Sequence, residues 1–445
     1  MGRMQDIRTK YLIIGNSAGG IGAAEAIREV DTVGSLTIIS DEPYPAYSRP
    51  LISKYLTGER TLEGMLFRPA DFYDRNDIVL LSGKKVRKVN PEFHACELDS
   101  GERIGWEKLL LATGGTPIVP SIDGISSKGV FTFISLDDAK AMDEFLGNAS
   151  KAVVIGGGLI GVSVTEALVK RGVQVAIIEM RERILNTILD EQASVMAEEA
   201  LRRAGVDIVT GHTVAQISGE QEVRGVVLED GKEISCDLVV VAIGVTPRVE
   251  LAVSAGVKVN RGIVVDRHMA TNHPDIYSCG DAAEAHDFVY GANRLNPIWP
   301  NAYLGGRTAG FNMASIMAEY PNVTAMNSLN YFGLDIATAG MVNPPGSGYE
   351  VLIKQTNGNY RKVVLEENLI VGMVFVGDID KSGIIYGLMR DQVNVSRFKQ
   401  VLLDDDFGLA SLPRELWQER LGRPPAGLVT QMAIPTRATG EPAGE

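Results

Sequence analysis

Cysteine is scarce in this chain, which has only three, Cys96, Cys236 and Cys279, among 445 residues. None of them stands at the C-x-x-C spacing of a redox-active pair. So few thiols exclude a disulfide scaffold and indicate a reducing compartment. Because an iron–sulfur cluster needs about four thiolates, the chain cannot hold such a cluster with its own cysteines.

Long apolar runs and an excess of positive charge are missing as well. No apolar stretch reaches the roughly 18 residues of a membrane-spanning helix, and the segment before Tyr11 has no signal-peptide core. We therefore expect a cytoplasmic protein without a membrane span. The net charge of −13 disfavours a nucleic-acid partner, because an acidic surface repels phosphates. The five histidines show no metal-ligand spacing, so no metal site is expected.

Glycine is abundant, with 48 residues, and it marks a pattern that occurs twice. The first copy runs in the order strand, glycine turn, helix, strand and acid, at 11–14, 15–20, 21–30, 36–40 and 41–42. Its turn reads Gly15-Asn-Ser-Ala-Gly-Gly20, and its acids are Asp41 and Glu42. Ser17 stands where a dinucleotide fingerprint has its second glycine.

The second copy repeats this order at 152–155, 156–161, 162–171 and 175–178 and ends in Glu179. Its turn, Gly156-Gly-Gly-Leu-Ile-Gly161, is a complete fingerprint. The glycines let the backbone approach a pyrophosphate, and the helix N-terminus stabilises its charge. Two purely structural turns are the alternative, but two copies in full context favour two dinucleotide sites. Glu179 favours NAD over NADP, although Arg181 and Arg183 keep NADP open.

Two further motifs complete a resemblance. They are Ala112-Thr113-Gly114 and Cys279-Gly280-Asp281. With the two fingerprints, over about residues 10–330, the chain resembles the FAD-dependent pyridine nucleotide-disulfide oxidoreductase superfamily. The resemblance implies an α/β fold with two Rossmann-like dinucleotide-binding domains, as in glutathione reductase, and a C-terminal α+β domain. It also implies an FAD-binding domain at 1–118 and 247–328, an NAD(P)-binding domain at 119–246, an α+β interface domain at 329–421 and a tail at 422–445.

The resemblance assigns a cofactor to each fingerprint. FAD is expected at Gly15, Ser17, Ala18, Gly20, Asp41, Glu42, Ala112, Thr113, Gly114, Gly280 and Asp281. NAD(H) is expected at Gly156, Gly158, Leu159, Ile160, Gly161, Glu179 and Gly244. Asp281 matches the aspartate that binds the ribityl chain of FAD, and it can also cap a helix expected to follow 276–282.

The segment 45–56 indicates which branch of this superfamily the chain resembles. Disulfide reductases carry a reactive cysteine here, and this chain has none. The segment resembles that of ferredoxin and rubredoxin reductases and of nitrite reductase large subunits. The resemblance implies that Arg49 and Pro50 pack near the flavin and that Lys54, the one catalytic candidate, places a cation near flavin N5. A glutamate usually pairs with this lysine in the family, but Ser163 stands at its position.

The segment 296–306 resembles the stretch that places a helix N-terminus at the flavin pyrimidine edge. This resemblance adds Trp299 and Asn301 to the FAD site, and the helix dipole would stabilise a negatively charged reduced flavin. Beyond it, alternating segments at 350–354, 362–365 and 369–376 predict antiparallel strands, and 384–391 and 396–403 predict helices.

The resemblance implies a function. NAD(H) and FAD would exchange a hydride, and FAD would exchange single electrons with an iron–sulfur partner protein or subunit. The run 391–413 resembles the ending of NADH-linked flavin subunits of aldehyde:ferredoxin-type and phenylglyoxylate oxidoreductase complexes. A stand-alone NADH oxidase or a rubredoxin or quinone reductase is the alternative. The direction of electron flow, and whether the chain forms a homo-oligomer or a hetero-oligomeric complex, stay open.

Overall fold

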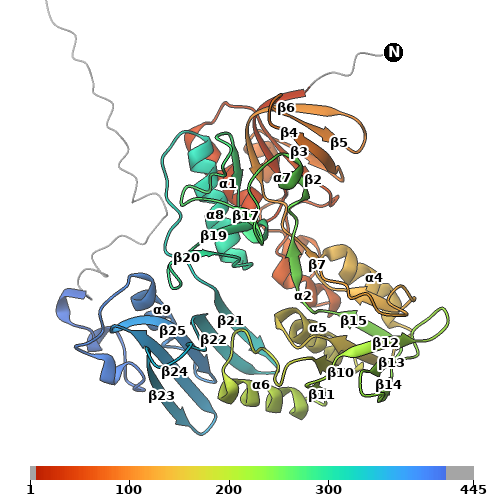
Figure 1. The fold of residues 1–445 in the computed structure, drawn as a ribbon, viewed down its shortest axis with the longest axis vertical. Helices are drawn as coiled ribbons and strands as arrows, with labels where there is room; N and C mark the ends of the chain where they lie inside the picture. Colours follow the sequence, from red (N-terminus) through yellow and green to blue (C-terminus); the bar gives the residue numbers. More distant parts are fainter. Residues whose placement is uncertain (1–6, 417–445) are drawn as a thin grey trace, which may run out of the picture.

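The computed structural model describes residues 7–416, which form three lobes (Figure 1). The tail predicted at 422–445 lies outside the described residues. No helix in the described part is long and apolar enough to span a membrane.

The first lobe is built on a sheet in the order β3-β2-β1-β6-β5-β4, with β18 beside β6. Its parallel strands are β1 (Ile7–Ile14), β2 (Leu36–Ser40), β3 (Ile78–Ser82), β6 (Arg103–Leu111) and β18 (Ile276–Ser278). The strands β4 (Val86–Asn90) and β5 (Ala95–Leu98) add an antiparallel edge. Every residue of β2 is buried, as expected for a parallel strand covered on both faces.

Two helices cross closely on this sheet. They are α1 (Ala18–Val30) and α8 (Trp299–Met313). A Cβ added at Gly306 would overlap the backbone of Gly19, and one at Gly310 would overlap that of Ala23. Glycine is therefore required at this crossing, and it brings the first glycine turn and the α8 segment together.

The second lobe contains a parallel sheet in the order β11-β10-β9-β15-β8. These strands are β8 (Val130–Thr132), β9 (Lys151–Ile155), β10 (Gln174–Glu179), β11 (Asp207–Thr210) and β15 (Leu238–Val241). The helices of this lobe are α4 (Leu136–Leu146), α5 (Leu159–Lys170) and α6 (Glu191–Arg203), and an antiparallel sheet adds β12 (Val214–Ser218), β13 (Gly225–Leu228) and β14 (Glu233–Ser235). The chain enters and leaves the lobe along two paired strands, β7 (Gly115–Pro117) and β16 (Val245–Pro247).

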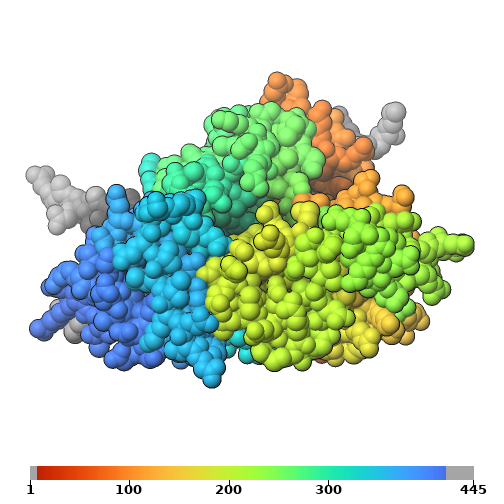
Figure 2. Space-filling model, turned by 60° about the horizontal axis from the view of Figure 1, so that its bottom comes forward, coloured from red at the N-terminus to blue at the C-terminus, as the bar shows by residue number. Residues whose placement is uncertain are grey.

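The third lobe is an antiparallel sheet in the order β21-β22-β25-β24-β23, followed by α9 (Ser382–Arg390). Its strands are β21 (Met326–Tyr331), β22 (Leu334–Gly340), β23 (Glu350–Thr356), β24 (Asn359–Glu366) and β25 (Leu369–Val376). Figure 2 shows this lobe, in blue, directly beside the second lobe, in yellow and green. At their contact, Lys362 on β24 pairs with Asp190 before α6 at 2.8 Å, and both side chains are buried.

Two predicted helices are wrong. The segment 396–403 holds only a 3-10 turn, Lys399–Val401. Phe398, Leu402 and Leu403 keep the spacing of a helix, but their packing into the core of the third lobe outweighs it. After 276–282 the chain forms another 3-10 turn, Gly280–Ala282, and then the strand β19 (Ala283–Asp287). The strand forms because β17 (Ile263–Val264) and β20 (Ala292–Arg294) both pair with it.

Candidate active site

The first glycine turn lies where β1 meets the end of β6. Gly15 has a φ of 121°, and a Cβ there would overlap the carbonyl of Ala112. A Cβ at Gly20 would overlap the carbonyl of Gly15. Ser17 precedes α1 as its N-cap, but its side chain makes no capping hydrogen bond. The first-turn amides of α1, which begin at Ala18, are thus left for an anion.

The second turn has the same construction. Gly156 has a φ of 109°, and a Cβ there would overlap the carbonyl of Ala242, while one at Gly161 would overlap the carbonyl of Gly156. Gly158 is the N-cap of α5 and faces open space, with no atom within 4 Å of an added Cβ. Leu159 and Ile160 begin the helix that follows it.

Glu179 ends β10 beside this turn. Its carboxylate accepts hydrogen bonds from the backbone amides of Gly157 at 2.7 Å and Arg181 at 2.8 Å. These bonds hold its negative charge at the mouth of the turn. Gly244 lies beyond the end of β15 with a φ of 132°, and its carbonyl accepts a hydrogen bond from the amide of Ile118 at 3.0 Å.

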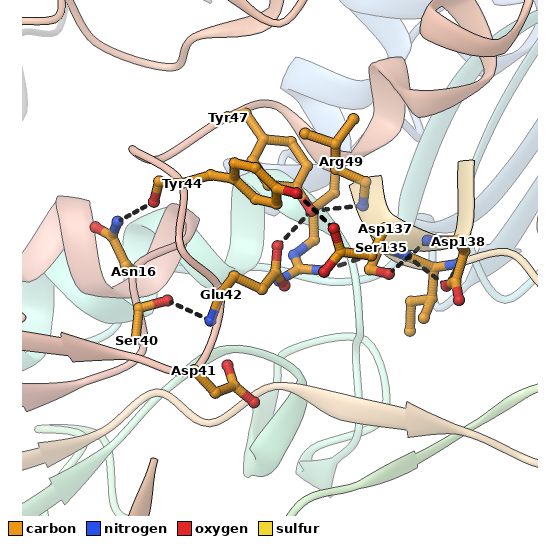
Figure 3. Close-up of polar contacts among 12 residues, drawn as sticks. Asn16, Ser40, Asp41, Glu42, Tyr44, Tyr47, Arg49, Ser135, Asp137 and Asp138 are labelled. Atoms are coloured by element: carbon orange, nitrogen blue, oxygen red, sulfur yellow. Dashed lines mark hydrogen bonds and ion pairs between the residues drawn. The ribbon is translucent and has the colours of Figure 1, made fainter. Parts of the chain in front are cut away.

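The two acids that follow β2 have separate surroundings (Figure 3). Glu42 forms an ion pair with Arg49 and accepts a hydrogen bond from the hydroxyl of Tyr47 at 2.7 Å. Burial raises the pKa of Tyr47, so its hydroxyl remains a donor. Both side chains also contact the start of α4. Arg49 donates to the carbonyl of Ile134 at 3.2 Å, and the hydroxyl of Tyr47 accepts from the amide of Leu136 at 2.9 Å. This cluster joins the first lobe to the second.

Asp41 contacts the returning connection instead. It pairs with Arg248 at 3.0 Å, and Arg248 also donates to the hydroxyl of Thr116 at 2.8 Å. The hydroxyl of Thr113 donates to the carbonyl of Arg248 at 2.7 Å, and the carbonyl of Gly114 accepts from the Arg248 amide at 2.9 Å. Three predicted residues therefore contact Arg248, Asp41 at its guanidinium and Thr113 and Gly114 at its backbone. The sequence motifs did not indicate Arg248, although it directly follows Pro247.

Asp281 lies in the 3-10 turn after β18. Burial raises the pKa of its carboxyl, and the positive charge of Arg49 acts in the opposite direction. Its carboxyl forms no hydrogen bond or ion pair with any residue of the described range 7–416. The N-cap role is wrong, because Cys279 is the cap residue of this turn. A half-buried carboxyl without a protein partner is suited to a ligand with hydroxyl groups.

Lys54 has a partner that the sequence did not indicate. It lies on α2 (Ile52–Leu56), directly after the 3-10 turn that contains Pro50, and pairs with Glu59 at 3.1 Å. Glu59 also pairs with Lys170 of α5 at 3.2 Å. The hydrogen bonds from Lys54 and Lys170 hold the pKa of Glu59 below its usual range. Lys54 thus has a carboxylate partner, Glu59, although residue 163 is a serine.

The N-terminus of α8 begins at Trp299, and its N-cap, Ile298, has no capping side chain. The Trp299 ring packs edge-on against Phe67 with a centroid separation of 5.0 Å. Asn301 is buried, and its side-chain amide donates to the carbonyl of Thr324 at 3.1 Å. Its side chain is thus bound to protein, while the first-turn amides of α8 have no capping side chain.

None of the three cysteines is suited to thiol chemistry. All are free and buried, and burial raises the pKa of each to about 12. A thiolate is the reactive form of cysteine, so none of them is reactive near neutral pH. Within residues 7–416 no group of three or more side chains is arranged to hold a metal ion.

These observations fit two dinucleotides. Each turn is closed by glycines at which a Cβ would overlap a neighbouring carbonyl, and each is followed by a helix whose first amides have no side-chain cap. An acid stands beside each turn, and the unpartnered carboxyl of Asp281 lies beside α8.

Comparison with known proteins agrees with this geometry. Residues 9–306 match the family model described as pyridine nucleotide-disulphide oxidoreductase, and residues 326–393 match that of the rubredoxin NAD+ reductase C-terminal domain. The epsilon subunit of NADH-dependent phenylglyoxylate dehydrogenase from Aromatoleum evansii is 31% identical, over 87% of this chain and 93% of the relative. The crystal structure of the covalent putidaredoxin reductase–putidaredoxin complex matches with a TM-score of 0.83 and 25% identity, over 93% of this chain and 99% of that chain.

Other relatives are longer than this chain. The assimilatory nitrate reductase electron transfer subunit of Bacillus subtilis is 29% identical over 90% of this chain, which spans only 51% of it. The chain likewise spans about half of the nitrite reductase of the same organism, at 49%. On the family match and the match to nearly the whole phenylglyoxylate dehydrogenase subunit, the chain belongs to the pyridine nucleotide-disulphide oxidoreductase family, whose members bind FAD and NAD(H).

Proposed function

We propose that this chain is a cytoplasmic reductase module that links NAD(H) to an iron–sulfur partner. FAD, when bound, exchanges a hydride with NAD(H) and releases electrons singly. The observation that carries the proposal is the presence of two separate dinucleotide cradles together with three buried, unreactive cysteines. With no thiol to receive electrons from the flavin, the acceptor lies outside the chain.

In this proposal the first lobe and α8 hold FAD. The turn residues Gly15, Ser17, Ala18 and Gly20 approach the pyrophosphate through their backbone. Asp281, whose carboxyl has no protein partner within residues 7–416, binds the ribityl hydroxyls.

The other proposed FAD contacts surround these groups. Asp41 and Glu42 lie at the adenosine end, and Lys54 stands on the nicotinamide side. The remaining contacts are Arg49, Pro50, Ala112, Thr113, Gly114, Gly280, Trp299 and Asn301.

The second lobe holds the nicotinamide nucleotide. Gly156, Gly158 and Gly161 form the cradle, Leu159 and Ile160 present the helix amides, and Gly244 closes the site. Both oxygens of Glu179 accept hydrogen bonds from backbone amides, which hold its negative charge beside the second turn. We therefore assign NAD(H) rather than NADP(H), because a carboxylate repels a 2′-phosphate.

The partner assignment draws on relatives. One solved relative is a covalent complex with putidaredoxin, and a similar chain is a subunit of phenylglyoxylate dehydrogenase. We propose that this chain likewise delivers electrons to, or receives them from, an iron–sulfur protein or subunit.

The test combines purification with anaerobic reduction. We expect the native protein to co-purify with iron–sulfur subunits and its flavin to be bleached by NADH within turnover time. A homogeneous single-chain flavoprotein that consumes oxygen rapidly with NADH would reject the reductase module and favour a stand-alone NADH oxidase. A flavin that NADH does not bleach would reject both functions.

A further inference from the structure

Asp287 is a buried carboxylate that none of the roles above uses. It ends β19 and is 0% exposed. It accepts hydrogen bonds from the Asn296 side chain at 2.9 Å, the Thr324 hydroxyl at 3.0 Å and the Val289 amide at 3.0 Å. All three donors are neutral. A buried carboxylate is tolerated only where hydrogen bonds satisfy it, and two of these bonds lead to α8.

The beginning of α8 needs support from outside the helix. Its N-cap is Ile298, whose apolar side chain cannot accept a hydrogen bond, and Pro300 in the first turn has no N–H. The first-turn amides are therefore free for a ligand, but no cap fixes where the helix starts. The position of this first turn must be set by contacts from neighbouring segments.

Two connections from Asp287 supply these contacts. The first runs directly to Asn296, two residues before the N-cap. The second runs through Thr324, whose carbonyl accepts a hydrogen bond from the Asn301 side chain at 3.1 Å. Tyr320 adds a hydrogen bond from its hydroxyl to the Asn301 carbonyl at 3.3 Å. In Figure 1, β19 and β20 lie beside α8.

We propose that Asp287 is a positioning residue that fixes the α8 N-terminus and thereby sets how strongly the helix dipole stabilises the reduced flavin. The inference rests on the placement of FAD at α8 in the proposed function. A helix dipole acts mainly within the first turn, so a displaced first turn weakens its field at the ligand. Asp287 itself contacts no cofactor in this proposal; it acts through Asn296, Thr324 and Asn301.

Three variants of the full chain separate this positioning role from an effect of the Asp287 charge alone and from a purely structural role. Asp287→Ala removes both the charge and the two connections. Asp287→Asn removes the charge but keeps an acceptor oxygen for Asn296 and Thr324. Thr324→Val keeps the charge of Asp287 and the backbone carbonyl that accepts from Asn301, but it removes the hydroxyl that donates a hydrogen bond to Asp287. Asp190→Asn, a change at another buried and multiply hydrogen-bonded carboxylate, controls for general destabilisation.

The readouts are the two-electron midpoint potential of the bound flavin, measured by chemical reduction without NADH, and the thermal unfolding temperature. We expect Asp287→Ala to bind the reduced flavin about tenfold more weakly relative to the oxidised one, which lowers the potential by about 30 mV. Thr324→Val should lower it by a smaller amount, and Asp287→Asn should stay near wild type. Asp190→Asn should lower the unfolding temperature and leave the potential unchanged.

Two results would overturn the inference. If Asp287→Ala and Asp287→Asn both raise the potential equally and Thr324→Val leaves it unchanged, Asp287 acts by its charge alone. If all variants unfold at lower temperature with wild-type potentials, its role is structural. Failure of the proposed function is a separate result, since it appears as wild-type flavin that NADH does not bleach.

Discussion

Gly158 and Gly161 stand in the same turn, but substitution should affect them in different ways. A Cβ at Gly161 would overlap the carbonyl of Gly156, whereas a Cβ at Gly158 would meet nothing within 4 Å. The backbone of Gly158, with a φ of −81°, is also accessible to any residue. Gly158→Val should therefore fold and place its side chain only where the pyrophosphate approaches.

The magnitudes follow from these contacts. For Gly158→Val we expect a stability loss of about 1 kcal/mol from the poorer N-cap. For Gly161→Ala we expect about 2–3 kcal/mol from overpacking against the backbone. At roughly 2–4 °C per kcal/mol, the two unfolding temperatures should differ by several degrees. Each charge-assisted hydrogen bond to phosphate contributes about 1.5–3 kcal/mol, so Gly158→Val should weaken NADH binding by about 10-fold to 150-fold.

The assay is anaerobic stopped-flow bleaching of the flavin over a range of NADH concentrations, with the FAD content of each variant measured in parallel. We expect Gly158→Val to retain wild-type FAD content. A Gly158→Val protein with the NADH dependence of wild type would refute the assignment of the second turn. Loss of FAD with intact NADH binding would show that the two cofactor sites are exchanged.

Three further changes test the site and the contact between lobes. Lys54→Met should retain FAD and slow flavin reduction by about tenfold or more, because a cation near the developing negative charge is lost; an unchanged stopped-flow rate would contradict this. Glu59→Gln should change that rate by at most about fivefold, because exposed pairs contribute at most about 1 kcal/mol; a loss as large as that of Lys54→Met would show that the pair acts as a unit. Asp190→Asn should destabilise the chain by about 3–5 kcal/mol, because Lys362 is left buried without its counter-ion. Burial opposes ionisation of Asp190, but Lys362 and Tyr360 outweigh it and hold the carboxyl pKa below its usual range. The contribution of the pair is therefore present above the ordinary aspartate pKa and is lost as the pH falls through the lowered pKa of Asp190. Unfolding curves of variant and wild type that stay equally far apart as the pH is lowered through the acid range would contradict this.

The sequence alone determined the features that depend on local chain geometry. A strand, a glycine turn and a helix form one continuous unit, so both cradles could be predicted from the spacing at 15–20 and 156–161. Their glycines are required by contacts within the unit or with the adjacent strand end, such as Gly20 against Gly15. The absence of a redox-active cysteine pair could likewise be predicted, because only three cysteines exist and none is paired in sequence.

Only the tertiary structure decided how the side chains divide among partners. The adjacent acids Asp41 and Glu42 look equivalent in sequence, but they contact Arg248 and Arg49, which lie on different segments. Glu59 pairs with both Lys54 and Lys170, and Asp287 is connected to Asn301 of α8 through Thr324. Asp41 and Arg248 are 207 residues apart, and Glu59 and Lys170 are 111 residues apart, so local spacing carries no information about these two pairs. The helices predicted after 282 and at 396–403 were wrong for the same reason, because strand pairing and core packing outweighed local propensity.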